Sequence, residues 1–109
     1  MTNTWLILVG VGYLEDRAMT YMLCRNRLVD FARWKRVFDS HAEAHRAAGL
    51  NLLHLWRSLD DPDNVFFLFE VKSIEKARAF IHAPEAAEAG KVSGFIEGEM
   101  HFLEEIDGY

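Results

Sequence analysis

The chain has 109 residues and a mass of 12.6 kDa; half of its residues are hydrophobic, 13% are aromatic and 27% are charged. This length and composition are typical of one folded domain with one core. The formal net charge of −5 and the lack of any run of several consecutive lysines or arginines argue against nucleic acid and anionic membranes as partners.

The N-terminal segment contains an apolar run over residues 5–14. At about ten residues it is much shorter than the roughly twenty that a transmembrane helix needs, and it lacks the features of a signal peptide. We expect residues 1–18 to form an extra strand or arm and residues 19–109 to form the domain. The single cysteine, Cys24, cannot form an internal disulfide, which favours a reducing, cytoplasmic location.

The first predicted elements of the domain are a strand over residues 20–27 and a helix that Asp30 caps and Gly49 ends. On a helical wheel, apolar residues and two histidines cluster on one side of this helix, and charged residues lie opposite. We expect the first side to face the core. It comprises Phe31, Trp34, Val37, Phe38, His41, Ala42, His45 and Ala48.

Next come two apolar, aromatic-rich runs, residues 51–59 and 65–72, which a dense turn signal at residues 60–64 joins. They predict a β-hairpin. Residues 65–69 include no polar side chain, so both faces of their strand should be covered, one by helices and the other by a second subunit. This is our reason for expecting a homodimer.

The last third of the chain predicts a second helix, which Ser73 caps and which runs through Ala83, and a short helical piece from Pro84 to about Ala89. Gly90 and Gly94 then release the chain into a final strand over residues 95–106. The order βαββαβ predicts an α+β domain of the ferredoxin-like type, with one antiparallel sheet and helices on one of its faces.

His41 and His45 are the best candidates for chemistry, because they lie one helical turn apart within the apolar stripe. Such a pair can hold a metal, but the sequence offers neither an HExxH motif nor clustered cysteines as further ligands. We therefore expect no bound metal. One of them can instead transfer protons to or from a bound organic molecule. They can also be structural residues at the rim of the core.

Three further residues are candidates for binding a ligand. His54 and Trp56 share one face of a strand, and Trp56 can line a pocket or simply fill the core. Asn26 ends the first strand, where its amide can anchor a ligand or begin the turn. GxSxG, P-loop and GxGxxG patterns do not occur, which argues against the common hydrolase, nucleotide and dinucleotide sites.

Several segments resemble the dimeric α+β barrel superfamily, which includes antibiotic biosynthesis monooxygenase-like proteins. They are residues 30–41 (DFARWKRVFDSH), 46–50 (RAAGL), 60–62 (DDP), 77–80 (ARAF) and 101–105 (HFLEE). The resemblance implies that the sheets of two subunits stack face to face and that each subunit has a small-molecule pocket between its sheet and helices. Since these are mainly fold-building positions, they specify architecture better than activity.

Residues 25–28 (RNRL) resemble the haem-degrading branch of this superfamily, where an asparagine contributes to the site. The tryptophan position of that branch is occupied here by Phe80, and its haem-ligating histidine would fall near Gly90. The resemblance therefore does not extend to haem, and we expect no cofactor.

Two functions remain open at this point. The first is a cofactor-independent monooxygenase-like or cyclase-like enzyme for a hydrophobic, aromatic or polyketide-like metabolite. Its catalytic residues would be His41 and His45, and its ligand-binding residues would be Asn26, Trp34, Phe38, His54 and Trp56. The second is a non-catalytic dimeric binding or scaffold domain. An RNA-recognition domain shares the strand order, but the acidic charge and Asn64-Val65, where a basic residue and glycine are usual, argue against it.

Overall fold

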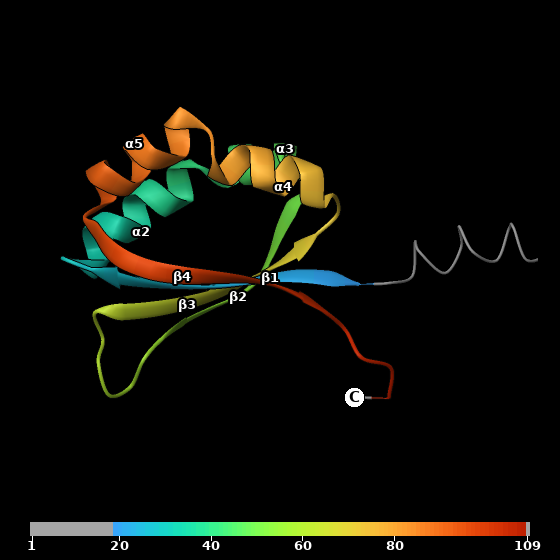
Figure 1. Ribbon diagram of the computed structural model, residues 1–109. Coiled ribbons are helices and arrows are strands. Elements are labelled where there is room, and N and C mark those ends of the chain that lie inside the picture. Colours follow the sequence, from blue (N-terminus) through green and yellow to red (C-terminus); the bar gives the residue numbers. More distant parts are fainter. Residues whose placement is uncertain (1–18, 109) are drawn as a thin grey trace, which may run out of the picture.

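The computed structural model describes residues 19–108 (Figure 1). Within them, four strands and four helices alternate in the predicted βαββαβ order, with each predicted helical region divided into two helices. Their order is β1 (Thr20–Leu28), α2 (Phe31–Ser40), α3 (Ala42–Ala47), β2 (Leu50–Arg57), β3 (Asn64–Val71), α4 (Ile74–Ile81), α5 (Pro84–Ser93) and β4 (Phe95–Glu104). The predicted strand or arm at residues 1–18 lies outside the described residues.

The strands form one antiparallel sheet in the order β2-β3-β1-β4, so β1 and β3 are central and β2 and β4 are at the edges. All four helices lie on one face of this sheet, and the other face carries no helix (Figure 1). The predicted α+β ferredoxin-like architecture is therefore confirmed. None of the helices in this part of the chain has the length and hydropathy to cross a membrane.

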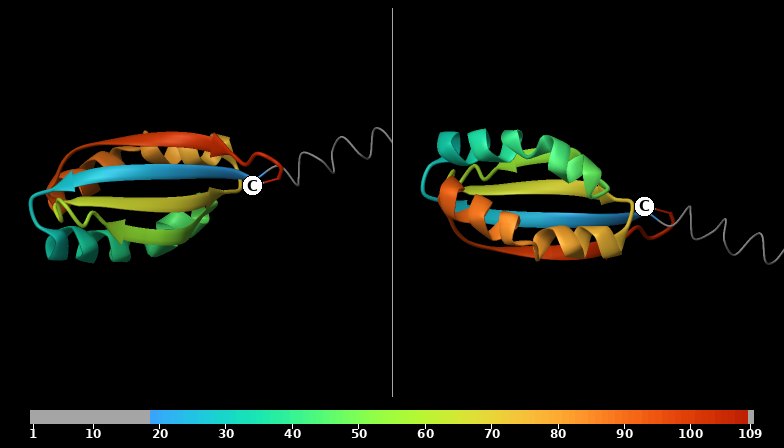
Figure 2. Two further views of the ribbon diagram at one scale, coloured as in Figure 1. Left: turned by 90° about the horizontal axis from the view of Figure 1, so that it is seen from below. Right: turned by 90° about the horizontal axis from the view of Figure 1, so that it is seen from above.

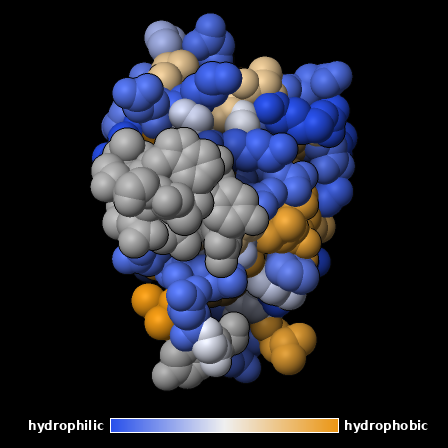
Figure 3. Space-filling model, turned by 90° about the vertical axis from the view of Figure 1, so that its right-hand side faces the viewer, coloured by the Kyte–Doolittle hydropathy of each residue, from blue (hydrophilic) through white to orange (hydrophobic). Residues whose placement is uncertain are grey.

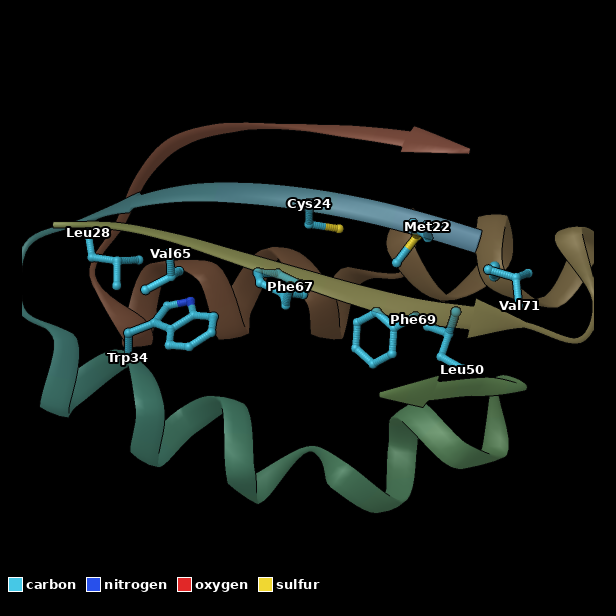
Figure 4. Close-up of a cluster of buried hydrophobic side chains, with 10 residues drawn as sticks. Met22, Cys24, Leu28, Trp34, Leu50, Val65, Phe67, Phe69 and Val71 are labelled. Carbon is cyan, nitrogen blue, oxygen red and sulfur yellow. The ribbon is translucent and has the colours of Figure 1, made fainter. Parts of the chain in front are cut away.

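The core lies between the sheet and the helices. On β3, side chains alternate between fully buried and half-buried, as expected when one face of a strand meets a helix layer. Figure 4 shows Trp34 extending from α2 toward the strands. Trp34 is 3% exposed and is the one buried residue of α2. The buried hydrophobic residues are Met22, Cys24, Leu28, Trp34, Leu50, Val65, Phe67, Phe69, Val71 and Ala77.

The first helical region differs from the prediction, because it breaks at His41 into α2 and α3. The carbonyl oxygen of Val37 contacts two side-chain atoms, Ser40 Oγ at 2.6 Å and His41 Nδ1 at 2.9 Å. The backbone N–H of His41 donates instead to the carbonyl of Phe38, three residues back. Side chains that compete for a helix carbonyl interrupt the regular ladder in this way.

The two predicted N-caps are confirmed, since Asp30 accepts from the backbone N–H of Arg33 at 2.8 Å and Ser73 from that of Lys76 at 3.2 Å. The last helix was predicted too short. Gly90 lies inside α5, which continues to Ser93, and Gly94 ends it with a φ of 80°. A glycine inside a helix, such as Gly90, lowers stability by only about 1 kcal/mol. The positive φ at the end of the helix, in contrast, favours a glycine, which is Gly94 here.

Candidate ligand-binding site

A cavity of about 530 Å³ lies between the sheet and the helices. Seen from the helix side, α2 and α3 form one row and α4 and α5 another, with β1 and β3 between the two rows (Figure 2). Side chains from both rows and from the central strands line the cavity. They include Met22, Cys24, Asn26, Trp34, Phe38, His41, His45, Phe67, Phe69, Phe80, Ile81, Ala89, Phe95 and Gly98.

The two helix rows contact each other at both ends. At one end, Arg33 of α2 donates from Nε to the carbonyl of Val92 at 2.8 Å and from a terminal nitrogen to that of Lys91 at 3.3 Å. At the other, the rings of His45 on α3 and Phe80 on α4 have centroids 5.4 Å apart. The cavity therefore lies between two points at which the helix rows are held together.

His45 occupies an aromatic part of the cavity. Its ring centroid is 5.1 Å from those of Phe38 and Phe69, in addition to its contact with Phe80. Burial among these rings, followed by the nearby His41 and Arg46 charges, lowers the pKa of His45 from 6.5 to about 4. At neutral pH His45 is thus uncharged, and one of its ring nitrogens can accept a hydrogen bond.

His41 also lines the cavity, at the break between α2 and α3. Its Nδ1 lies 2.9 Å from the carbonyl oxygen of Val37, and because a carbonyl can only accept, Nδ1 carries the proton in this contact. Nε2 of a neutral His41 is then left as an acceptor. The structure thus brings the two predicted histidines to one cavity, with one of them fixed in its tautomer.

Asn26, on β1, connects the sheet to Trp34. Trp34 is the lining residue nearest the start of α2, and we call it the end wall of the cavity. With its amide nitrogen toward the carbonyl oxygen of Arg25, at 2.9 Å, its amide oxygen faces Nε1 of Trp34 at 3.3 Å. The opposite orientation would place oxygen against oxygen and N–H against N–H, so the hydrogen bonds decide the assignment. The Trp34 ring in turn stacks on Phe38, with centroids 4.6 Å apart.

The cavity lining is almost without charge. Among the described residues that line it none is Lys or Arg, and the exposed Glu85 and the half-exposed Glu99 are the acidic ones. Burial raises the pKa of the Cys24 thiol to about 12, so this side chain is also neutral. Residues 19–108 contain no group of three or more His, Cys, Asp and Glu placed to hold a metal ion.

His54 and Trp56 do not line this cavity, contrary to the prediction. They do share a face, and their rings stack with centroids 4.9 Å apart, but on the side of the sheet without helices. The reason is a register shift between Leu52 and His54, where the extra residue Leu53 reverses the alternation of β2. Without this bulge, His54 and Trp56 would point the same way as the buried Leu50.

Sequence reasoning missed several residues that line the cavity, among them Met22, Cys24, Phe80, Ile81 and Gly98. Most of these are ordinary apolar residues without a distinctive pattern. Gly98 had a usable signal, because a glycine inside a predicted strand indicates a bulge or a close approach of the backbone. A Cβ atom at this position would lie 2.2 Å from the carbonyl oxygen of Arg25, which no side chain allows.

Comparisons with known proteins agree with this architecture. A scan against protein-family models gives no match, and neither does a search of curated proteins. Among solved structures, a Bordetella bronchiseptica protein assigned provisionally as an antibiotic biosynthesis monooxygenase superimposes with a TM-score of 0.68 at 14% identity, covering 82% of this chain and 98% of that one. The chain has the fold of that monooxygenase-type domain.

Two further structures share this monooxygenase-type fold. SnoaB, a cofactor-independent oxygenase from Streptomyces nogalater, has a TM-score of 0.59 at 14% identity and covers 79% of this chain and 91% of its own. A nipsnap family protein of unknown function from Agrobacterium tumefaciens has a TM-score of 0.63 at 13% identity, with 84% and 91% covered. Proteins with this fold thus include both an oxygenase and a protein without a known activity, so the fold alone does not specify a reaction.

The low pKa of His45 predicts how stability depends on pH. Between pH 6.5 and about 4 the unfolded chain binds a proton at His45 that the folded chain does not. This contribution to stability is therefore complete above pH 6.5 and is lost as the pH falls toward 4. Because the ring partly faces the open cavity, we expect a loss of about 1–2 kcal/mol. Urea unfolding at both pH values should show that His45→Phe removes this loss and His82→Phe keeps it.

Proposed function

We propose that this protein is a small enzyme that oxidises or cyclises a neutral, aromatic or polyketide-like molecule bound between its sheet and helices, without a metal or organic cofactor. The observation that carries the proposal is the placement of two histidines in an aromatic cavity that is almost free of charge. The fold shared with SnoaB, which is a cofactor-independent oxygenase, supports an oxygenase activity by analogy.

The size and polarity of the cavity support this class of ligand. Its volume of about 530 Å³ falls within the usual range of small-molecule sites, roughly 300–1,000 Å³. A carboxylate or phosphate group would find no lining Lys or Arg to pair with among the described residues, and would approach Glu85. Burying such a charge without a partner is costly. A flat, uncharged molecule can instead pack against the half-buried aromatic side chains of the lining, Phe38 and His45 among them.

The two histidines would have different roles. With a pKa of about 4, His45 is a neutral imidazole at pH 7 with one unprotonated ring nitrogen, which would accept a hydrogen bond from a hydroxyl of the ligand and orient it. His41 would act as the base that draws a proton from the bound ligand, using Nε2, since Nδ1 contacts the Val37 carbonyl. An electron-rich carbanion formed in this way can react with O₂ directly.

A 1,8-dihydroxyanthrone is a suitable probe for this reaction. Its CH₂ group would become C=O, one oxygen atom of O₂ would enter the product and the other would leave as water. We expect one O₂ to be consumed for each quinone formed, in buffer with chelator and without added cofactor, at a rate above that of the buffer alone. Tight binding of the probe without such an excess of O₂ uptake would contradict the enzyme and favour the non-catalytic binding domain.

We also propose that two copies of the chain pair through the sheet face that carries no helix. Phe66 and Leu68 of β3 lie on this face and remain half-buried rather than buried in the single chain. Seen end-on, hydrophobic patches appear at the surface below the largely hydrophilic helix layer (Figure 3). Arg25, on the same face, bonds to Glu97 at 2.9 Å and to Glu99 at 3.0 Å, so these charges would enter an interface already paired.

The substitution Leu68→Arg tests this pairing. An unpaired guanidinium in the middle of the stacked sheets would be buried without compensation, so we expect the variant to be monomeric where the unmodified chain is dimeric. The same change at Leu59, which is fully exposed in the hairpin loop, should leave the dimer intact. Sedimentation velocity at low micromolar concentration measures the mass. A monomeric unmodified chain would refute the pairing.

A further inference from the structure

Gly98 and Asn26 face each other directly across β1 and β4, at the end of the cavity that Trp34 closes. A Cβ atom at position 98 would lie 2.2 Å from the carbonyl oxygen of Arg25 and 2.9 Å from the side-chain amide of Asn26. Both distances are shorter than real Cβ contacts allow. The absence of a side chain at Gly98 is therefore what leaves room for the Asn26 amide in its observed place.

In that place, both the nitrogen and the oxygen of the Asn26 amide have hydrogen-bond partners within the protein. Its nitrogen donates to the Arg25 carbonyl at 2.9 Å and its oxygen accepts from Trp34 Nε1 at 3.3 Å. The aromatic rings that Trp34 contacts, those of Phe31, Phe38 and Phe67, offer its indole N–H no oxygen or nitrogen acceptor. A buried indole N–H that loses its acceptor carries a free-energy cost, so this bond selects one orientation of the ring.

The orientation of Trp34 is passed along the cavity wall. Its ring stacks on Phe38 at 4.6 Å with an angle of 20° between planes, and Phe38 contacts the His45 ring at 5.1 Å. A series of contacts thus runs from Gly98 on β4 through Asn26, Trp34 and Phe38 to His45 on α3. A shift of the indole would alter the wall against which a flat ligand stacks and the position of His45.

We infer that Asn26 is a positioning residue: its amide, seated in the space that Gly98 leaves, holds Trp34 as the end wall of the ligand cavity. This assigns Asn26 a role other than that of a direct anchor for the ligand. The inference rests on the proposed ligand-binding function only for its effect on affinity. The hydrogen bond between Asn26 and Trp34 can be tested without any ligand.

The test uses a chain in which Trp5→Phe and Trp56→Phe leave Trp34 as the single tryptophan. Its indole Nε1–H then gives one resolved NMR resonance. We expect Asn26→Leu and Gly98→Ala to shift this resonance and to weaken binding of the dihydroxyanthrone at least tenfold. Asn26→Asp keeps an acceptor for the indole but loses the donor to the Arg25 carbonyl, so it should shift the resonance less than Asn26→Leu does.

Gly90→Ala is the matched control, because Gly90 also lines the cavity but a Cβ there meets nothing closer than 3.8 Å. We expect it to leave the indole resonance in place. If Asn26→Leu leaves both the resonance and the affinity unchanged, the inference is wrong, whether or not Gly98→Ala folds. A shifted resonance in a chain that binds no probe at all would uphold the positioning role and contradict the proposed function instead.

Discussion

Replacing His45 with phenylalanine is expected to lower turnover of the dihydroxyanthrone about tenfold, the cost of losing one hydrogen bond that orients the ligand for proton removal by His41. Phenylalanine keeps the ring contacts with Phe38, Phe69 and Phe80 but removes the hydrogen-bond acceptor. The cavity retains its shape, so the loss should appear in kcat and in the preference for hydroxylated over unsubstituted aromatic ligands.

Initial rates of O₂ uptake and quinone formation measure this effect. His82→Phe makes the same change at an exposed histidine at the end of α4, and it should keep full turnover. The fold of His45→Phe is checked by its unfolding midpoint at pH 7, where His45 is uncharged in both the folded and the unfolded parent, so that the substitution removes no charge. Equal kcat values for His45→Phe and the parent would show that the imidazole takes no part in the reaction.

Replacing Phe69 with alanine is expected to destabilise the domain by about 3–5 kcal/mol, the usual cost of truncating a large aromatic ring in a core. Phe69 is 2% exposed on the central strand β3, and its ring contacts Phe38, His45 and Phe67. A typical domain has only about 5–15 kcal/mol of stability, so this variant should unfold at a much lower denaturant concentration.

Guanidinium unfolding followed by circular dichroism measures this loss. Phe95→Ala, at a cavity-lining ring that is 41% exposed, should cost less than about half as much, because less apolar area is buried there. Both rings line the cavity, so the comparison separates the buried side of its lining, which belongs to the core, from its exposed rim. Equal losses for the two variants would contradict the placement of the core under β1 and β3.

The fold was largely predictable because its signals are local and strong. Asp30 and Ser73 are short polar side chains directly before helical patterns, and both cap as expected. The turn between β2 and β3 is dense in aspartate, and Asn64 donates its backbone N–H to the Asp61 carbonyl within it. Alternation of side chains along β3 then follows from its pairing with β1.

The candidate site was only partly predictable, because its details depend on contacts between elements. The helical stripe placed Trp34, Phe38, His41 and His45 on one face, which is the face that lines the cavity. The bulge at Leu53 turns Trp56 away from the helices. It depends on how β2 pairs with β3, and no residue pattern in the sequence predicts it.

The break at His41 and the amide of Asn26 are similar cases. Each depends on which partner a side chain finds in the folded chain: the Val37 carbonyl for His41 and the indole of Trp34 for Asn26. The type of a polar residue predicts that its side chain needs a hydrogen-bond partner when buried, but the sequence does not predict which residue the partner is. For this reason the sequence marked Asn26 as important and assigned it a different role.

Filling the cavity tests its use as a ligand site most directly. Ala89 of α5 lines the cavity, whereas Ala87 on the same helix is exposed and does not. Titration of each variant with the dihydroxyanthrone, followed by its absorbance, should show that Ala89→Trp weakens binding at least tenfold and Ala87→Trp leaves it unchanged. If both variants bind the probe as the parent does, the ligand does not occupy the space between the sheet and its helices.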